Sequence, residues 1–221
     1  MLAGKLRGNH PNTVQTTRLL EFCPHPRGAI ILLILMIKLM TMALVAVLLP
    51  VFGAFVFRRL SRDYVRLGQL TRTGTVLQVG LFTLHGASSY VFLDSRLSTM
   101  DTSSPLFGFA LLLVCGGLIL LLSTMGSFGI KRAVGQEPGT LVCTGMYRRS
   151  RNPQLVFYGL AVAGYSFLWP SWTGAIWVLL YAALAQMMVR TEETHLKRIY
   201  GNDYVDYCTS TPRYLDIPGM K

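Results

Sequence analysis

Five long apolar runs constrain the fold of this 221-residue chain more than any other feature of its sequence. The runs are Gly28–Phe57, Thr73–Leu93, Pro105–Thr124, Pro153–Trp169 and Trp172–Val189. Each has close to the roughly 20 residues that an α-helix needs to cross the hydrocarbon layer of a bilayer. The first is long enough to tilt or protrude, and the fourth is short enough to begin near the interface. The pattern predicts an all-α, polytopic membrane bundle of five transmembrane helices.

Composition and charge agree with a membrane protein. Apolar residues make up 52% of the chain and charged residues only 14%, which argues against a soluble domain. With five crossings, fifteen Lys and Arg residues fall on the face that carries the C-terminus and five fall on the other face. The positive-inside rule then predicts a cytoplasmic C-terminus and an N-terminus outside, in an inner (plasma) membrane. Topology and anionic lipid account for the basic charge, so no nucleic-acid partner is expected.

The chain divides into three parts. Residues 1–27 are polar and predict an N-terminal arm, residues 28–124 hold membrane helices 1 to 3, and residues 125–221 hold the remaining helices and a cytoplasmic tail. Between helices 1 and 2, residues 58–72 are expected to form an arginine-rich loop on the anionic leaflet. The four cysteines form no CxxC pair and no metal-binding spacing, so no metal is predicted.

The last two apolar runs are separated by only Pro170 and Ser171, so the second should run straight back along the first as a helical hairpin. Arg151 and Arg190 then lie at the same end of this hairpin, at the membrane surface. The adjacent Glu192 and Glu193 join them, in a chain that is otherwise apolar. This charged cluster is the best candidate for chemistry.

Asn152 and Pro153 have the residue types that begin helices, because Asn caps an N-terminus and Pro suits the first helical position. A helix N-terminus with Arg151 beside it favours a bound carboxylate or phosphate. Glu192 and Glu193 would either form salt bridges with nearby arginines or meet a cationic ligand group. S-adenosylmethionine carries a carboxylate, an ammonium and a sulfonium and fits both requirements, but a zwitterionic lipid head group fits equally well.

The C-terminal third resembles the isoprenylcysteine carboxyl methyltransferase and phospholipid methyltransferase superfamily. In order along the chain, the residues that carry this resemblance are Leu141-Val-Cys-Thr-Gly-Met-Tyr147, Arg151-Asn-Pro153, Arg190-Thr-Glu-Glu193, Leu196, Tyr200-Gly201, Tyr204, Tyr207 and Pro212-Arg213. The resemblance implies that residues 125–221 form a methyltransferase-like cofactor-binding region.

The family resemblance also implies roles for individual residues. S-adenosylmethionine would be bound by Leu141, Val142, Tyr147, Arg151, Asn152, Pro153, Glu192 and Glu193. Arg151 and Arg190 would orient a methyl acceptor. An amine acceptor would lose its proton to Glu193 or His195. Carboxylate and thiolate acceptors need only positioning and desolvation. The acceptor is expected to be lipophilic, or a small apolar molecule, in contact with membrane lipids.

Two other functions fit the same region. Related sterol and enone reductases use NADPH, whose 2′-phosphate could be held by Arg148 and Arg149. A non-catalytic membrane protein could also keep the same helices. Binding of S-adenosylmethionine or of NADPH distinguishes these alternatives from a methyltransferase.

Overall fold

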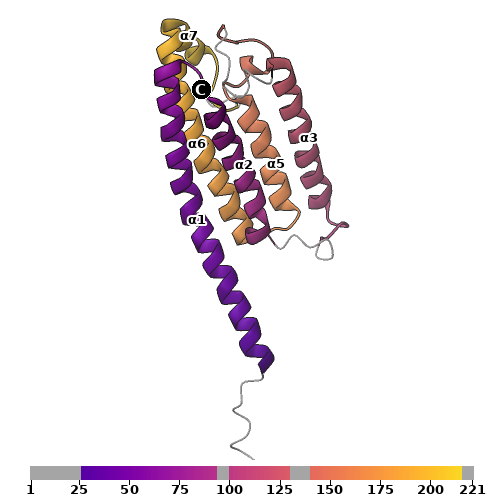
Figure 1. Ribbon diagram of the computed structural model, residues 1–221. Coiled ribbons are helices and arrows are strands. Elements are labelled where there is room, and N and C mark those ends of the chain that lie inside the picture. The colour runs from indigo at the N-terminus through magenta and orange to yellow at the C-terminus, as the bar shows by residue number, and fades with distance from the viewer. Residues whose placement is uncertain (1–25, 94–99, 130–139, 216–221) are drawn as a thin grey trace, which may run out of the picture. The chain divides into compact units, whose positions relative to one another are not determined.

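The computed structural model describes residues 26–93, 100–129 and 140–215. Within these ranges all of the regular secondary structure is helical, which confirms the all-α prediction (Figure 1). The elements are α1 (Pro26–Leu67), α2 (Arg72–Phe92), α3 (Pro105–Phe128), the 3-10 helix η2 (Gly145–Arg148), α5 (Pro153–Phe167), α6 (Trp172–Tyr200) and α7 (Asn202–Ser210). The predicted N-terminal arm lies outside the described residues, apart from the first two residues of α1.

The chain divides into two compact units, Met1–Met40 and Thr41–Lys221. The described part of the first unit is the N-terminal portion of α1. Its apolar side chains are open to the surroundings: Ile30, Leu33 and Ile37 are each more than half exposed. Such exposure of large aliphatic side chains on a helix is expected for contact with lipid rather than with water.

Three helices among the described residues are long and apolar enough to cross a membrane: α1 from Gly28, α3 through Ser127, and α6. The other two predicted crossings, α2 and α5, are not among the helices that are long and apolar enough. α5 has only 15 residues, and α2 includes the polar residues Gln78, His85 and Ser88. The expectation of five transmembrane helices is therefore supported for three of them.

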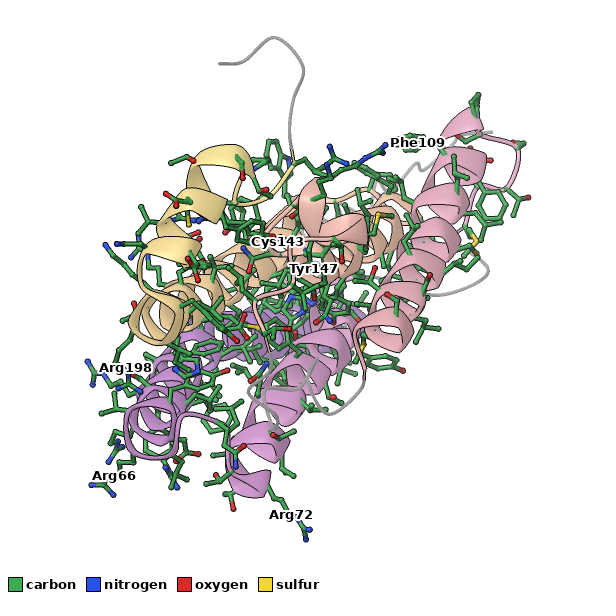
Figure 2. The ribbon with its side chains drawn as sticks, turned by 90° about the horizontal axis from the view of Figure 1, so that it is seen from above. Arg66, Arg72, Phe109, Cys143, Tyr147 and Arg198 are labelled. Atoms are coloured by element: carbon green, nitrogen blue, oxygen red, sulfur yellow. The ribbon has the colours of Figure 1, made fainter. Side chains whose placement is uncertain are left out.

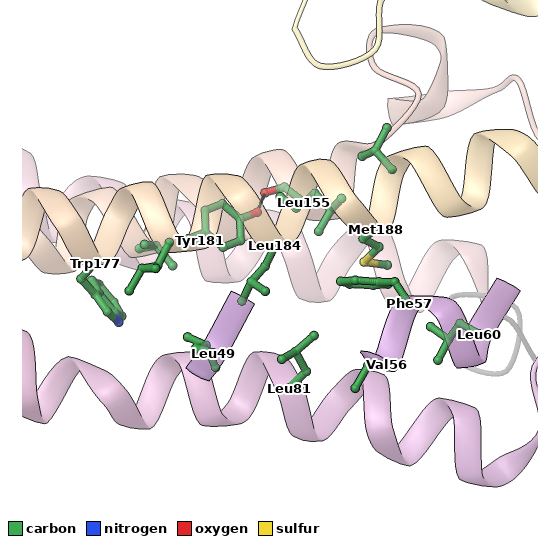
Figure 3. Packing of buried hydrophobic residues seen from close by; sticks show 14 of the residues in the cluster. Leu49, Val56, Phe57, Leu60, Leu81, Leu155, Trp177, Tyr181, Leu184 and Met188 are labelled. Atoms are coloured by element: carbon green, nitrogen blue, oxygen red, sulfur yellow. Dashed lines mark hydrogen bonds between the residues drawn. The ribbon is translucent and has the colours of Figure 1, made fainter. Parts of the chain in front are cut away.

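The core of the second unit is built from α1, α2 and α6 (Figure 3). Val56, Leu81 and Leu184, one from each helix, are fully buried. Gly53 allows α1 to approach α6 closely, because an added Cβ would lie 2.6 Å from a methyl carbon of Leu184. This packing fixes the position of α6 against α1 and α2, and α6 carries part of the candidate site.

Polar residues of α2 point into the bundle, as membrane helices require. The fully buried His85 stacks on Trp177 of α6 with ring centroids 4.8 Å apart, and its Nε2 lies 3.1 Å from the Trp177 carbonyl. In return, the indole of Trp177 donates to the His85 carbonyl at 2.9 Å and to Ser88 at 3.2 Å. These contacts are interhelical hydrogen bonds that join α2 to α6.

Helices α3 and α5 run antiparallel with their backbones in close approach. A Cβ added to Gly117 would lie 2.7 Å from the Phe157 carbonyl oxygen, and one added to Gly164 would lie 2.7 Å from the carbonyl oxygen of Ala110. The neighbouring Gly116 has nothing within 4 Å of the same position. Two specific glycines therefore set the α3–α5 distance.

The prediction of an arginine-rich loop over residues 58–72 is wrong for most of its length. α1 remains helical to Leu67, because its buried face continues through Leu60 and Asp63. Only residues 68–71 form the connection to α2. Asp63 accepts a hydrogen bond from the hydroxyl of Thr71 at 2.5 Å, and Thr71 caps α2 by accepting from the Gly74 amide at 3.0 Å.

Helices α5 and α6 are joined by residues 168–171 and lie antiparallel. The Tyr181 hydroxyl on α6 donates to the Leu155 carbonyl near the start of α5. α6 extends well beyond Val189, as predicted, and ends at Gly201, where φ is +55°. The short helix α7 that follows was not predicted. It is held by Tyr204 and Tyr207, both buried and one turn apart on its inner face.

Candidate functional site

A network of two arginines and one glutamate lies where α5 begins and α6 leaves the apolar core. Arg213 binds the carboxylate of Glu193 through both oxygens, with its Nε 2.9 Å from Oε1 and an Nη 2.6 Å from Oε2. An Nη atom of Arg151 lies 3.1 Å from the same Oε1. The side chains of Arg151 and Glu193 are only 13% and 15% exposed, so this network is shielded from solvent.

The backbone at the start of α5 is fixed by the segment that follows α7. The Arg151 amide donates to the Pro212 carbonyl at 3.0 Å, and the Asn152 side-chain amide donates to the Arg213 carbonyl at 2.9 Å. Asn152 occupies the N-cap position, but its side chain makes no capping hydrogen bond, contrary to the prediction. The physical reason is that the C-terminal segment offers it a tertiary acceptor. Pro153 is buried at the first helical position.

Residues of α7 surround the guanidinium of Arg151. An Nη atom of Arg151 lies 2.6 Å from the sulfur of Cys208. Burial raises the pKa of the Tyr204 hydroxyl and the charge of Glu193 raises it further, whereas Arg151 acts in the opposite direction. Hydrogen bonding to Glu193 raises the pKa of Arg213 as well. These contacts hold the Arg151 side chain in one place.

The network carries a net positive charge, because two guanidinium groups surround one carboxylate. The Nε of Arg151 is buried and has no hydrogen-bond partner among the described residues. A buried donor without a partner is costly, and an anion placed beside it would remove that cost. The arrangement fits the carboxylate of a ligand, as the sequence predicted for Arg151 and the start of α5.

Glu193 is less suited to a cationic ligand than the sequence suggested. Both of its oxygens already accept hydrogen bonds from Arg213, and Oε1 also faces Arg151. A third cation there would add to an excess of positive charge. Of the two readings left open by the sequence, the salt-bridge network holds for Glu193. A contact between Glu192 and a cationic ligand group stays a prediction.

Glu192 lies near the segment before α5. Burial raises the pKa of the Tyr147 hydroxyl, and the negative charge of Glu192 raises it further, which places Glu192 close to η2. The Tyr207 hydroxyl of α7 donates to the Tyr147 carbonyl and so attaches η2 to the C-terminal helix. Just before η2, Leu141 and Val142 are half-buried. Tyr147 and Glu192, both of which the sequence predicts to bind the cofactor, therefore lie close together.

Arg190 lies on a different part of the α6 surface from Glu193. It is exposed, and it lies one turn before Glu193. Its charge acts on the Tyr214 hydroxyl, which donates to the side chain of Gln186 at 2.6 Å. Arg190 therefore lies at the same end of α5 and α6 as Arg151, but it faces the outside of the bundle beside Tyr214.

No cluster of three or more His, Cys, Asp or Glu side chains that could hold a metal ion occurs among the described residues. Cys115 and Cys143 are exposed free thiols and Cys208 is a half-buried one.

Residues 106–203 match the model of the phospholipid methyltransferase family. The match covers somewhat less than half of the chain, and the matched family is part of the integral membrane methyltransferase superfamily. This confirms the resemblance drawn from the residues between Leu141 and Arg213. No match was found among curated proteins or among solved structures.

The family match begins earlier in the chain than the sequence motifs and also ends earlier. It begins at residue 106, at the start of α3, so the matched region includes α3 as well as α5 and α6. It ends at residue 203, before most of α7 and before Arg213. The residues that hold Arg151 and Glu193 from the C-terminal side therefore lie beyond the matched region.

Sequence reasoning missed part of this site. Arg213 appeared in the resemblance without a role, and Cys208 was considered only as one of four cysteines that form no CxxC pair. A signal for α7 was present in Tyr204 and Tyr207, whose spacing is that of one helical face. No local pattern could have shown that Arg213 returns to Glu193, twenty positions earlier.

Proposed function

We propose that this protein is an integral membrane methyltransferase that uses S-adenosylmethionine and acts on a lipophilic acceptor. The observation that carries the proposal is the shielded Arg151–Glu193–Arg213 network at the start of α5, within or next to the region that matches the phospholipid methyltransferase family. The match to the family supports methyl transfer, and the network would supply a place for the cofactor's carboxylate.

The residues present fit this cofactor at two points. Arg151, with its buried Nε and the net positive charge around it, would hold the carboxylate. Glu192, beside Tyr147, would face the cationic end. Leu141 and Val142 precede Tyr147 and would pack against the rest of the molecule. Arg213 would act indirectly, by keeping Glu193 in place and Glu193 in turn fixing Arg151.

When bound, S-adenosylmethionine supplies a methyl group on a positively charged sulfur that a nucleophile displaces in line. The protein's own contribution is to orient the acceptor and to exclude water, which matters for carboxylate and thiolate nucleophiles. An amine acceptor must also lose a proton. Glu193, whose oxygens are occupied by arginine, is a poor proton acceptor in this arrangement, so that role falls to Glu192.

The acceptor is proposed to reach the site from the bilayer. α5 has only 15 residues, so its start at Pro153 is proposed to lie near the interface. Arg190 is exposed beside Tyr214 on the outer surface of α6. Arg190 could hold an anionic or polar head group there while the apolar tail stays in lipid. The family name indicates phospholipid chemistry for its members and favours a lipid acceptor for this chain.

The membrane orientation proposed from the sequence is supported by the placement of charge in the second unit. Around the end formed by the C-termini of α1 and α6 and the start of α5, the described residues include twelve Lys and Arg. They are Arg58, Arg59, Arg62, Arg66, Arg72, Arg148, Arg149, Arg151, Arg190, Lys197, Arg198 and Arg213. At the opposite end of the second unit, the described residues include one charged side chain, Asp101. The basic end is proposed to be cytoplasmic.

A direct comparison of ligands tests the proposed function against its alternatives. The purified full-length protein in detergent would be heated with S-adenosylmethionine or with NADPH. A ligand that binds the folded state raises the midpoint of unfolding, so only S-adenosylmethionine should raise it. A shift with NADPH alone would support the reductase, and a shift with neither would support a non-catalytic protein. Transfer of labelled methyl groups to membrane lipid extracts then identifies the acceptor class.

A further inference from the structure

The exposed face of α1 changes abruptly from apolar to basic. Leu44, Leu48, Val51 and Phe55 are each more than half exposed and follow one another at three- or four-residue intervals, so they lie on one face of the helix. The same face continues through the exposed Arg58, Arg62 and Arg66. One continuous stripe is therefore suited first to hydrocarbon and then to negative charge.

The arginines of this stripe are not consumed by acidic neighbours. Asp63, the nearest acidic residue on α1, is buried and already paired with Arg59 and Thr71. The interaction recorded for Arg62 is with the backbone, a 3.5 Å contact between its Nε and the Arg58 carbonyl. The charges of Arg58, Arg62 and Arg66 therefore remain available to a partner outside the chain.

The basic surface extends onto neighbouring elements. Arg198 at the end of α6 donates to the Tyr64 carbonyl of α1, which brings the exposed Lys197 and Arg198 next to the stripe. Figure 2 shows Arg66, Arg72 and Arg198 at the rim of the molecule, with their side chains extended outward. The surface is thus peripheral and separate from the interior network around Arg151.

We propose that Arg58, Arg62 and Arg66 form a binding surface for anionic phospholipid head groups. Arg58 and Arg62 are about 6 Å apart along the helix axis, close to the thickness of roughly 5–8 Å of one head-group layer. Both therefore reach the phosphate level directly above the apolar stripe, and Arg66 approaches it from the aqueous side. The guanidinium fork matches phosphate geometry, and the aliphatic stem can lie along lipid.

The test measures lipid binding directly and does not depend on methyl transfer. Native mass spectrometry of the detergent-solubilised protein would measure its binding of phosphatidylglycerol, with phosphatidylcholine for comparison. The test variant is the pair Arg58→Gln/Arg62→Gln. The matched control is Arg148→Gln/Arg149→Gln, which removes two exposed charges from the same end of the bundle. Helix content and thermal unfolding check that each variant is folded, and the single change Arg62→Gln replaces the pair if it is not.

Phosphatidylglycerol should bind more tightly than phosphatidylcholine. Its affinity should fall by roughly fivefold for each arginine removed from the stripe and by less than about twofold in the control pair. Glycerol 3-phosphate at millimolar concentration should not displace the lipid. Equal binding of both lipids, or equal loss in both variant pairs, would overturn the proposal. Displacement by glycerol 3-phosphate would also overturn it, since the surface would then be a site for soluble phosphates.

Discussion

Arg213 donates hydrogen bonds to both carboxylate oxygens of Glu193, from Nε to Oε1 at 2.9 Å and from an Nη to Oε2 at 2.6 Å, although the two residues are twenty positions apart in the chain. Because Glu193 also contacts Arg151 at 3.1 Å, the segment after α7 controls the geometry of a residue at the start of α5. The C-terminal segment is therefore a structural part of the candidate site, although it lies beyond the region matched by the family.

Replacing Arg213 by Gln should weaken binding of S-adenosylmethionine without abolishing it. A hydrogen bond between charged groups contributes about 1.5–3 kcal/mol. The Arg213 side chain is 42% exposed, so solvent screening should reduce that to about 1 kcal/mol, or roughly fivefold in affinity. Titration calorimetry measures the change.

A double-mutant cycle separates positioning from simple loss of charge. Arg213→Lys keeps the charge but lacks the fork, so it should recover only part of the affinity. Arg213→Gln combined with Glu193→Gln should show a coupling of about 1 kcal/mol. Additive effects of the two changes on cofactor affinity would show that Arg213 does not act through Glu193.

The packing of α3 on α5 gives a test with an internal control one residue away. Gly117→Ala should destabilise the protein by about 1–3 kcal/mol, because the new Cβ would lie 2.7 Å from the Phe157 carbonyl oxygen. Gly116→Ala should be neutral or slightly stabilising, since nothing lies within 4 Å of its Cβ and Ala favours the helix. Thermal unfolding in detergent compares them, and equal destabilisation would contradict the described α3–α5 contact.

The proposed orientation can be checked by labelling single cysteines in a variant without the native ones. Thr102→Cys, just before α3, should react with a membrane-impermeant maleimide added to sealed cells. Arg62→Cys, on the basic face of α1, should react only after the membrane is permeabilised. Labelling of position 62 in sealed cells would contradict the predicted orientation and indicate the reverse one.

Helix positions were predictable because the apolar runs and their breaks are local signals. The end of α6 at Gly201 followed from its residue type, and the polar extension beyond Val189 kept a helical pattern. The loop predicted over residues 58–72 was wrong because charge alone suggested a loop, whereas Leu60 and Asp63 continue the buried face of α1. Counting arginines did not show which side of the helix they occupy.

The candidate site was predictable only where its residues share a short segment. Arg151, Asn152 and Pro153 were found as a helix start, and Glu192 and Glu193 as an unusual acidic pair. The partner choice of each group depended on tertiary contacts. The C-terminal segment takes the Asn152 side chain away from its capping role and neutralises Glu193, and neither effect leaves a local pattern.

Lateral entry of the acceptor predicts a dependence on chain length. In a series of acceptors with the same head group, kcat/KM should rise with each added methylene, by up to about 0.8 kcal/mol for each one buried. Arg190→Ala should raise KM or lower kcat for every member while leaving cofactor affinity nearly unchanged, because Arg190 lies outside the Arg151 network. A flat series, or a preference for short water-soluble acceptors, would rule out entry from the bilayer.

The central claim is that Arg151 and the charges around it hold S-adenosylmethionine, and calorimetric titration of purified variants tests it most directly. Arg151→Ala should weaken binding by roughly 10- to 150-fold, the loss expected for one charge-assisted contact of about 1.5–3 kcal/mol. Glu193→Gln, which acts only through the position of Arg151, should weaken binding by a smaller factor. Arg149→Gln, which removes an exposed charge two positions from Arg151, should leave the affinity within about twofold. Unchanged affinity in both Arg151→Ala and Glu193→Gln would contradict the account.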